Sequence, residues 1–457
     1  MRLTQNGAIV YCCKTMKRNF VIFILVCICL FTSQAQKKWT LKECIDYAVS
    51  QNILVKQMEL QKQNAELALN NSQMNRLPNL NASIGQNWNF GRTQIASGLY
   101  ENHSQTTNNL SVSSTVPLFS GFLIANQIRK SKLDLKASIL TLERAKEDLS
   151  LDITSLFLQI LFNREILKIR EEQMHLIEMQ LERTQKLVAA GKVPYAQILD
   201  VEAQISNDKV LLLEAKNNLA LALLDLAQTM NLENPLDFEI SSPELPNIEN
   251  EFIESPVSIF NHAVNTKASV KSNEIRVMSA GKSIKIAKAS YSPSLSLSLS
   301  YGNNYFYSYS REDNASFQEQ IKNNAGKYIG LTLNIPLFNR FSARNQVRSA
   351  KINFSNEQLI WEDSKKQLYK EIQTAYVNAV YAKEKYLASH KAIATVAESF
   401  KHAQKRYEVG KATVFEFNEA RNKLITTQSE QIRAKYDYIF RKKILDFYNG
   451  VSVEPEE

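Results

Sequence analysis

The side chains that could do chemistry are few in this chain of 457 residues, and they are dispersed. A metal centre needs ligands at short, regular spacings, and the histidines show no such spacing. We find no phosphate-binding loop, no serine nucleophile elbow and no cysteine cluster. The five histidines are His103, His175, His262, His390 and His402. The sequence therefore argues against an enzyme and predicts no cofactor and no bound metal.

One pair of carboxylates could still act together, because Glu416 and Glu419 are three residues apart and would share one face of a helix. Two carboxylates on one helix face lie close together, and this like-charge proximity would raise some of their pKa values. The alternative is a surface ion pair between Glu419 and Lys423, which would contribute roughly 0.2–0.5 kcal/mol. The secondary structure around Glu416 and Glu419 is needed to distinguish these two interpretations.

The chain contains a tandem repeat, since two stretches match at a constant offset of 219 residues. The first stretch begins at Val116 and the second at Ile335. The matched positions include Pro117 with Pro336, Arg129 with Arg348, and Gly191 with Gly410. An upstream match at an offset of 215 pairs Pro78 with Pro293, so the second copy has four extra residues, which a surface loop would absorb. A repeat is one supersecondary unit used twice, so function should be sought in the unit.

Residues 1–35 have the features of an export signal peptide. Lys17 and Arg18 precede an apolar run from Phe20 to Phe31, and small residues follow it at a suitable cleavage site. The alternative is a membrane anchor, but the run is shorter than the roughly 20 residues that a spanning helix needs. Four of the five cysteines lie in this segment, so only Cys44 would remain after cleavage, and no intramolecular disulfide could form.

Composition narrows the class of protein further. The formal net charge of +9 falls to about +5 once residues 1–35 are removed, and no basic stripe is interleaved with aromatic residues. The sequence therefore predicts no nucleic-acid partner. Only 12 glycines and 10 prolines occur in the chain, which favours long uninterrupted helices over many turns.

An acidic, proline-rich stretch divides the two copies. Residues 231–255 contain seven acidic residues and no lysine or arginine, which is typical of a linker. We therefore expect a first structural repeat at 36–230, built from a helix, two strands, a long helix and a return helix. A second repeat of the same order is expected at 256–449, and a C-terminal tail at 450–457.

Each repeat contains two segments that alternate between apolar and small polar residues. The clearest is Ser294 to Tyr301, where leucines occupy one face and serines the other, and the others are Leu80 to Phe90, Asn108 to Leu118 and Tyr328 to Leu337. With no second apolar sheet to pack on, this pattern is typical of the wall of a membrane barrel. The alternative is an edge sheet of a soluble sandwich. Aromatic residues between Tyr301 and Tyr309 follow the clearest strand, as expected where it would leave the hydrocarbon for the headgroups.

Four strands cannot close a barrel by themselves. In lipid every backbone N–H and C=O group must be paired, so an open sheet edge is not tolerated. If the strands cross a membrane, the chain must therefore form an oligomer, and a trimer would supply twelve strands.

Two segments of about 72 residues contain no proline, so each would form a helix of about 105 Å. They run from Phe119 to Ala190 and from Phe338 to Val409. The return helices, expected at 194–230 and 413–448, are half as long. Short helices at 40–75 and 256–291 supply the missing half, so a short and a return helix stacked end to end would pair with one long helix.

Near the turns, the apolar positions of the long helices recur at alternating intervals of three and four residues. This pattern is the seam of a coiled coil. The positions are Met174, Ile177, Leu181, Thr184 and Val188 in the first copy, and Ile393, Val396, Phe400, Ala403 and Tyr407 in the second.

In these features the chain resembles the TolC-like outer-membrane efflux proteins over essentially its whole mature length. The matching residues are Trp39-Thr40-Leu41 at the first helix, Pro78, the Val-Pro-Leu-Phe and Ile-Pro-Leu-Phe junctions, and the two Gly-Lys turns. The resemblance implies an α+β membrane protein and a homotrimer, with a twelve-stranded β-barrel in the outer membrane of a Gram-negative bacterium and an α-helical periplasmic tunnel. It also implies a passive exit duct of a tripartite efflux or type I secretion system, joined to an inner-membrane pump through a periplasmic adaptor.

By this resemblance, the turns between the long and return helices correspond to the tips that contact the adaptor in the family. These tips are Gly191, Lys192, Val193, Pro194, Gly410, Lys411, Ala412 and Thr413. The alternative is ordinary helix punctuation, with glycine as a left-handed cap, lysine complementing the helix dipole and proline opening the next helix. Both interpretations can hold together. Gln197 stands where the family has an acidic residue, so the choice of adaptor stays open.

The resemblance also places Glu416 and Glu419 at the tunnel entrance, where three copies would form a ring of six carboxylates. Tyr407 matches a tyrosine in the contacts that close this entrance, but its expected partners differ. Ala412 replaces a basic residue and Gln197 an acidic one. We therefore expect Tyr407 and Gln197 to form the entrance gate through a hydrogen bond rather than a charge network.

A periplasmic coiled-coil structural or adaptor protein is the competing hypothesis, because a helical rod would have the same seam. Such a rod has no use for alternating strands, so extraction with the outer membrane would separate the two hypotheses. The exported substrate is not determined by the sequence. A metal-export role would favour methionine or histidine along the tunnel, and the eight methionines are not clustered.

Overall fold

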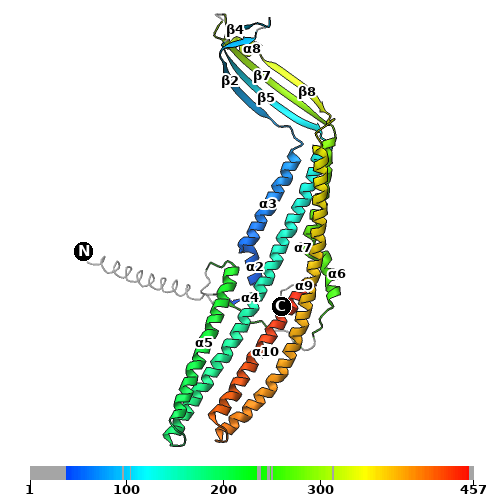
Figure 1. Cartoon of the computed structure of the whole chain (residues 1–457). Coiled ribbons are helices and arrows are strands. Elements are labelled where there is room, and N and C mark those ends of the chain that lie inside the picture. The colour runs from blue at the N-terminus through cyan, green and yellow to red at the C-terminus, as the bar shows by residue number, and fades with distance from the viewer. Residues whose placement is uncertain are drawn as a thin grey trace, which may run out of the picture. The chain divides into compact units, whose positions relative to one another are not determined.

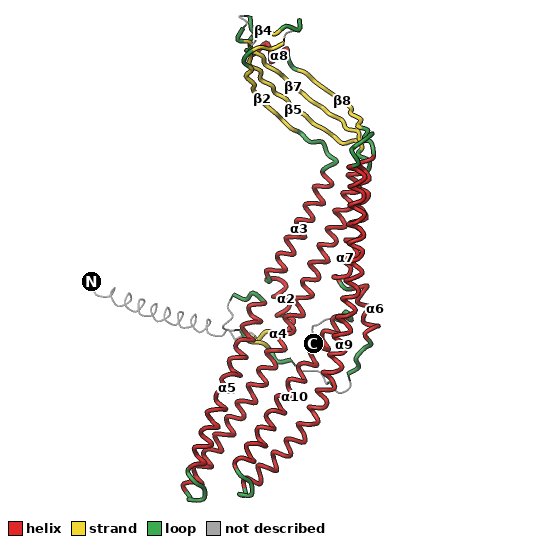
Figure 2. The backbone as a smooth tube through the Cα atoms, viewed as in Figure 1, coloured by secondary structure: helices red, strands yellow, loops and turns green. Residues whose placement is uncertain are grey.

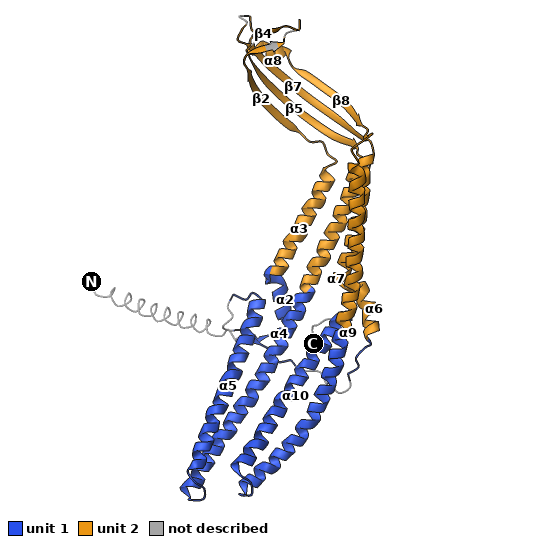
Figure 3. Cartoon of the chain, viewed as in Figure 1, with its two compact units in different colours: residues 1–53, 147–255, 374–457 blue, residues 54–146, 256–373 orange. Residues whose placement is uncertain are grey.

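The structure is a computed structural model, and it describes residues 38–451 except 95–96, 103, 234–237, 244–247, 249–250 and 311–312. The expected signal peptide lies outside the described residues, as does most of the expected C-terminal tail. The described chain combines long helices with a four-stranded sheet and two short strand pairs (Figure 1, Figure 2). It divides into two compact units, each assembled from separate stretches of sequence (Figure 3).

The four-stranded sheet lies in the unit formed by residues 54–146 and 256–373. Its antiparallel order is β2 (Asn81–Asn89), β5 (Gln105–Phe119), β7 (Ser294–Ser308) and β8 (Gly326–Asn334). The four expected strands are thus confirmed with shifted ends. The aromatic cluster was expected after the third strand, and this was wrong for most of it. Tyr301 to Tyr307 lie inside β7, because pairing with β5 continues as far as Ser308.

The register of the sheet collects most of its apolar side chains on one face. Leu295, Leu297 and Leu299 of β7 pair with Leu333, Leu331 and Ile329 of β8, and residues directly opposite each other share a face. The same face holds Ile84 and Trp88 of β2 and Leu110, Val112 and Val116 of β5. The other face consists mainly of serine, threonine, glycine and asparagine, and Ser83 Oγ and Ser111 Oγ lie 2.7 Å apart on it. The sheet therefore has one apolar and one polar face.

Where β7 extends beyond its pairing with β8, side-chain amides form hydrogen bonds with its backbone. The loop after β7 contains a short helix, α8 (Phe317–Asn323). Gln320 accepts a hydrogen bond from Phe306 N at 2.8 Å and donates one to Phe306 O at 2.8 Å. Asn314 makes the same two bonds with Ser308. These amides replace the missing neighbouring strand. The loop between β2 and β5 instead forms a small hairpin of β3 (Arg92–Gln94) and β4 (Tyr100–Asn102).

The long helices α4 (Leu123–Ala189) and α9 (Ser342–Glu408) each have 67 residues. Both their first and their last residues are separated by 219 positions, which is the repeat offset found in the sequence. The return helices are α5 (Ala196–Thr229) and α10 (Val414–Tyr448). Ile177 and Thr184 of the expected seam are buried in α4.

The expected short helices are each broken in two, which corrects the prediction of continuous helices. The pieces are α2 (Leu41–Gln51) and α3 (Ile53–Met74) in the first copy, and α6 (Pro256–Thr266) and α7 (Ala268–Lys288) in the second. The breaks fall at Asn52 and Lys267, and both residues have extended backbone. Asn52 Nδ2 donates to Thr229 O at 3.0 Å. A tertiary contact at the end of α5 therefore accompanies the first break.

The other unit comprises the described residues up to 53, with 147–255 and 374–451. In it, the acidic stretch expected to be a linker packs against the helices. Its strand β6 (Glu239–Ile240) pairs in parallel with β1 (Lys38–Trp39), and Ile240 is buried. Tyr438 OH donates to Glu251 Oε2 at 2.6 Å, and Lys383 Nζ donates to Glu251 O at 2.6 Å. Apolar residues between the acidic ones explain this packing.

Both strand-to-helix junctions use two consecutive residues with left-handed backbone. They are Gly121 and Phe122 after β5, with φ of 59° and 63°, and Arg340 and Phe341 after β8, with φ of 52° and 60°. In each junction two phenylalanine rings meet edge to face. The centroid distances are 5.7 Å for Phe119–Phe122 and 5.6 Å for Phe338–Phe341. The repeat therefore preserves an unusual turn as well as its sequence.

Candidate functional site at the helix turns

The two turns between long and return helices end α4 and α9 in the same way. Gly191 has a φ of 68° and Gly410 a φ of 73°. In the first turn, Gly191 N donates to Val188 O at 2.9 Å and Lys192 N to Leu187 O at 2.9 Å. The second turn repeats this pair of bonds, with Lys411 N donating to Arg406 O at 2.8 Å. This is the Schellman motif, so helix punctuation accounts for the two glycines.

The helices that follow the turns begin differently. Thr413 caps α10 and forms a capping box with Glu416, because Thr413 N donates to Glu416 Oε2 at 2.7 Å and Glu416 N donates to Thr413 Oγ1 at 3.2 Å. Pro194 lies two residues before α5, and Tyr195 provides no side-chain cap there. The hydrogen bonds from Thr413 lower the pKa of Glu416, and the Arg406 guanidinium 3.9 Å away also contributes. Glu416 is therefore charged at neutral pH.

We expect Thr413→Val to raise the pKa of Glu416 towards its ordinary value, because the substitution removes the hydroxyl of the capping box. A carboxylate with a lowered pKa stabilises the folded state above its unfolded pKa. Its contribution is lost as the pH falls through the folded pKa. The order of the second turn should therefore decrease on acidification in the wild type and be less sensitive to acid in Thr413→Val. Carboxyl chemical shifts of Glu416 during a titration measure this, and unchanged shifts in the variant would contradict it.

The Tyr407 ring lies in an aromatic and cationic cluster beside the second turn. It stacks on Phe417 with the ring centroids 4.9 Å apart, and Arg183 lies 5.7 Å from its centroid. Arg183 also donates to Glu408 O at 2.9 Å, which joins α4 to the end of α9. Within the described part of one chain, Tyr407 and Gln197 share no hydrogen bond. Tyr407 instead stacks on Phe417. The role of Tyr407 and Gln197 as an entrance gate stays a prediction.

A buried ion pair joins the two return helices. Arg421 Nη2 of α10 donates to Asp208 Oδ2 of α5 at 3.1 Å, and their side chains are 2% and 8% exposed. Burial lowers the pKa of Arg421, and the attraction of Asp208 opposes this. Arg421 Nε and Nη1 are buried without a hydrogen-bond partner among the described residues. The pair is therefore only partly satisfied, so either partner alone would be costly to bury.

The remaining acidic residue of the expected entrance, Glu419, is exposed one turn after Glu416. In the described part of the chain it forms no ion pair with Lys423, which removes support for the surface-pair alternative. Glu416 and Glu419 lie on α10 at its first and second turns, so one chain presents both carboxylates near the helix tip. Whether copies of this pair form a ring depends on the assembly.

Comparison with known families now identifies the chain. The family model of outer membrane efflux proteins matches residues 44–232 and again residues 260–447. The chain belongs to the outer membrane efflux protein family. Membership places it in the outer membrane of a Gram-negative bacterium. The two matches correspond to the two repeats expected from the sequence, and the first ends two residues beyond the expected boundary at 230.

Two curated relatives of this outer membrane efflux protein are TolC proteins. The outer membrane protein TolC of Salmonella enteritidis is 21% identical over 319 residues, which cover 69% of this chain and 64% of that protein. The Escherichia coli K12 protein is 22% identical over 306 residues, covering 66% and 61%. The chain thus spans less than two thirds of the length of these relatives.

Solved structures of channel proteins share the fold. CusC has a TM-score of 0.76 at 15% identity, with 90% of this chain and 92% of that chain covered. The outer membrane protein VceC of Vibrio cholerae has a TM-score of 0.74 at 16% identity, covering 91% and 97%. The Campylobacter jejuni outer membrane channel CmeC has a TM-score of 0.74 at 18% identity, covering 91% and 87%.

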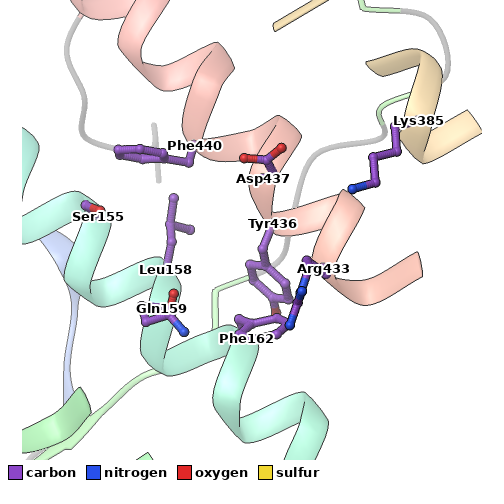
Figure 4. Close-up of a pocket in the computed structure, with 9 residues that line it drawn as sticks. All are labelled: Ser155, Leu158, Gln159, Phe162, Lys385, Arg433, Tyr436, Asp437 and Phe440. Carbon is purple, nitrogen blue, oxygen red and sulfur yellow. The ribbon is translucent and has the colours of Figure 1, made fainter. Parts of the chain in front are cut away.

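Several cavities lie along the described helices of the unit that holds the turns. A cavity of about 280 Å³ beside the second turn is lined by Leu176, Met179, Gln180, Arg183, Phe400, Gln404, Tyr407, Glu408, Phe417 and Arg421. A larger one of about 430 Å³ is lined by residues of α4, α9 and α10 (Figure 4). There the Arg433 guanidinium lies 5.9 Å from the Phe162 ring centroid, and burial raises the pKa of Tyr436 to about 12. Among the described residues, no group of His, Cys, Asp and Glu could hold a metal.

None of the helices that the structure describes combines the length and the apolar character needed to cross a membrane.

Sequence reasoning missed the residues that organise this site. Arg183, Asp208, Phe417 and Arg421 were not predicted. The first, second and fourth of these join the hairpin of α4 and α5 to that of α9 and α10, whereas Phe417 stacks on Tyr407 within the second hairpin. The helical period could have placed Arg421 on a buried face, since Ile425 one turn later is also buried. Its partner Asp208 is 213 residues away and carries no local signal.

Proposed function

We propose that this outer membrane efflux protein is a passive exit duct, coupled to an inner-membrane pump through a periplasmic adaptor. The observation that carries the proposal is the sheet, which has one apolar face and, within a single described chain, edge strands β2 and β8 that are each paired on one side only. Lipid tolerates no open edge. Three chains would pair β8 of each with β2 of the next and close a barrel of twelve strands.

The polarity of the sheet supports this assembly. Exposed apolar residues on the edge strands, such as Ile84 on β2 and Leu331 on β8, would face lipid after closure. The serine, threonine and asparagine side chains on the opposite face would line a hydrated lumen, as in barrels whose interiors are polar. A periplasmic coiled-coil structural or adaptor protein would bury no such sheet, so the channel proposal is favoured.

The helix turns are the proposed contact with the adaptor and the proposed tunnel entrance. The tips at 191–194 and 410–413 protrude between helices and are largely exposed in one chain. We assign Glu416 and Glu419 to an acidic entrance ring. Stacking of Tyr407 on Phe417, together with Arg183, supports a gate that is held by aromatic and cationic contacts.

Single-channel recording of the purified protein in a planar bilayer tests the proposed function. Discrete openings from a heat-modifiable trimer that extracts with the outer membrane are expected. A protein that is released from membranes by carbonate and gives no openings would instead support the coiled-coil alternative.

The acidic ring makes a separate prediction. We expect Glu416→Gln combined with Glu419→Gln to lower the cation selectivity of the open channel, because six negative charges would leave the entrance. Glutamine at position 416 retains a capping acceptor, so the turn should stay folded. Reversal potentials in asymmetric potassium chloride measure the selectivity.

Glu182→Gln is the matched control, since Glu182 is an exposed carboxylate near the same end of α4 and is paired with Lys186. Its selectivity should equal that of the wild type. Unchanged selectivity in the double variant would keep the channel and place its constriction elsewhere.

A further inference from the structure

We propose that the second strand-to-helix junction binds the phosphate of phospholipids in the periplasmic leaflet, through Arg340 and Arg344 beside the exposed Phe338–Phe341 pair. The inference rests on the proposed function, because it requires the apolar face of the sheet to lie in lipid. It goes beyond that function because it assigns the binding of a lipid headgroup to Arg340 and Arg344.

The two arginines are exposed and uncompensated. Neither has an ion pair or a hydrogen bond with any residue in the part of the chain that the structure describes. The Arg344 guanidinium lies 5.9 Å from the centroid of the Phe341 ring, which holds it next to the aromatic pair. A planar guanidinium presents several N–H donors and matches a phosphate in a bidentate manner. The junction therefore offers two donors that need an anionic acceptor.

Arg340 adopts a backbone conformation that disfavours it. Its φ of 52° lies in the left-handed region, where a side chain costs free energy relative to glycine. The first junction has Gly121 at the corresponding position, with a φ of 59°. Phe122 and Phe341 share the left-handed backbone of the next position, so the two turns differ in strain only where Arg340 replaces glycine, and this extra strain points to a use for the arginine side chain. The exposed guanidinium of Arg340 is suited to one such use, the binding of an anion.

The surroundings of the arginines fit the boundary between hydrocarbon and headgroups. The apolar face that includes Leu331 and Leu333 ends at this junction. Leu337 is 93% exposed and Phe338 73% exposed, and they lie three and two residues before Arg340. The long helix α9 starts just beyond, at Ser342. Aromatic side chains and cations that follow an apolar band are the arrangement found at membrane interfaces. A phospholipid headgroup on the side of the helices is thus the occupant that matches both the charge and the apolar surface.

The two junctions differ at these positions, so the site occurs once in each chain. At the offset of 219, Arg340 corresponds to Gly121 and Arg344 corresponds to Ala125. Arg129 of the first copy corresponds to Arg348 and supplies a matched control.

The test measures retention of phosphatidylglycerol by the purified trimer with native mass spectrometry. Three retained lipids per trimer are expected for the wild type. At least a tenfold weaker affinity is expected for Arg344→Ala and for Arg340→Gly, whereas Arg129→Ala should behave as the wild type. Diacylglycerol, which lacks the phosphate, should not be retained.

Thermal melting of the trimer provides a second readout. Arg340→Gly should melt at a higher temperature than the wild type in lipid-free detergent, since glycine relieves the left-handed strain. Its melting temperature should not rise on addition of phosphatidylglycerol, whereas that of the wild type should. If both arginine variants melt lower even without lipid, the residues bind a neighbouring chain and the inference is overturned.

Two further results would also overturn it. Equal phosphatidylglycerol affinity in all variants would show that the arginines do not bind the headgroup, and full displacement of the lipid by inorganic phosphate would show a free-anion site. Either result with normal channel conductance would leave the proposed function intact, whereas absence of both trimer and conductance would reject the proposed function itself.

Discussion

Asp208→Ala should destabilise the unit that holds the helix turns by about 3–5 kcal/mol, the usual cost of breaking a buried ion pair by removing one partner. The substitution leaves the Arg421 guanidinium, 2% exposed, without the one ion-pair partner that it has among the residues described in the structure. Two further nitrogen atoms of that guanidinium already lack hydrogen-bond partners among the described residues. The loss should appear as a lower midpoint of chemical unfolding, followed by helical circular dichroism.

The double variant Asp208→Leu with Arg421→Met separates the charge effect from packing. Replacing both members of a buried pair with apolar residues is often neutral or stabilising, so we expect most of the lost stability to return. Asp200→Ala, at an exposed position on the same helix, is the control and should change stability by less than about 0.5 kcal/mol. A single variant as stable as this control would show that Arg421 finds another acceptor.

Gly121→Ala should disrupt the first strand-to-helix junction through two separable effects. A Cβ atom at this position would lie 2.4 Å from Ser292 Cβ and 2.9 Å from Ser292 Oγ, so the two segments would have to move apart. Such overpacking costs about 1–3 kcal/mol. The φ of 59° adds about 1–2 kcal/mol for any residue with a side chain. The melting temperature of the purified trimer and its yield in the outer membrane measure the combined loss.

Gly191→Ala isolates the backbone term, because Gly191 has a φ of 68° and nothing lies within 4 Å of the added Cβ. It should therefore cost less than Gly121→Ala. Adding Ser292→Gly to Gly121→Ala should remove the clash with the Ser292 side chain but leave the backbone strain. The loss of stability should then be close to that of Gly191→Ala. Equal losses in Gly121→Ala and Gly191→Ala would mean that the contact with Ser292 relaxes without cost.

The two acidic residues at the tip show how a candidate site can serve the fold and the function together. Glu416 is proposed for the entrance ring, and its carboxylate also forms the capping box with Thr413. Glu419 makes no such contact and is the freer charge. The expected selectivity of a trimer thus depends on one residue that also stabilises its own helix.

Elements and turns of this protein follow from local sequence. Period-two alternation located the four strands, and the absence of proline together with the offset of 219 located α4 and α9 within a few residues. Gly191 and Gly410 ended both helices as expected, because only glycine adopts left-handed backbone without steric cost. These features depend on neighbours in the chain, so a single sequence is sufficient to recognise them.

Tertiary structure decided the rest. The breaks at Asn52 and Lys267, the packing of the acidic stretch, and the stacking of Tyr407 on Phe417 all involve segments that no periodicity connects. The Asp208–Arg421 pair spans 213 residues, and the sequence around either residue does not identify the other as its partner. Local sequence patterns indicate which face of a helix is buried and where the helix ends. The partner of a buried side chain is determined only when distant helices pack together.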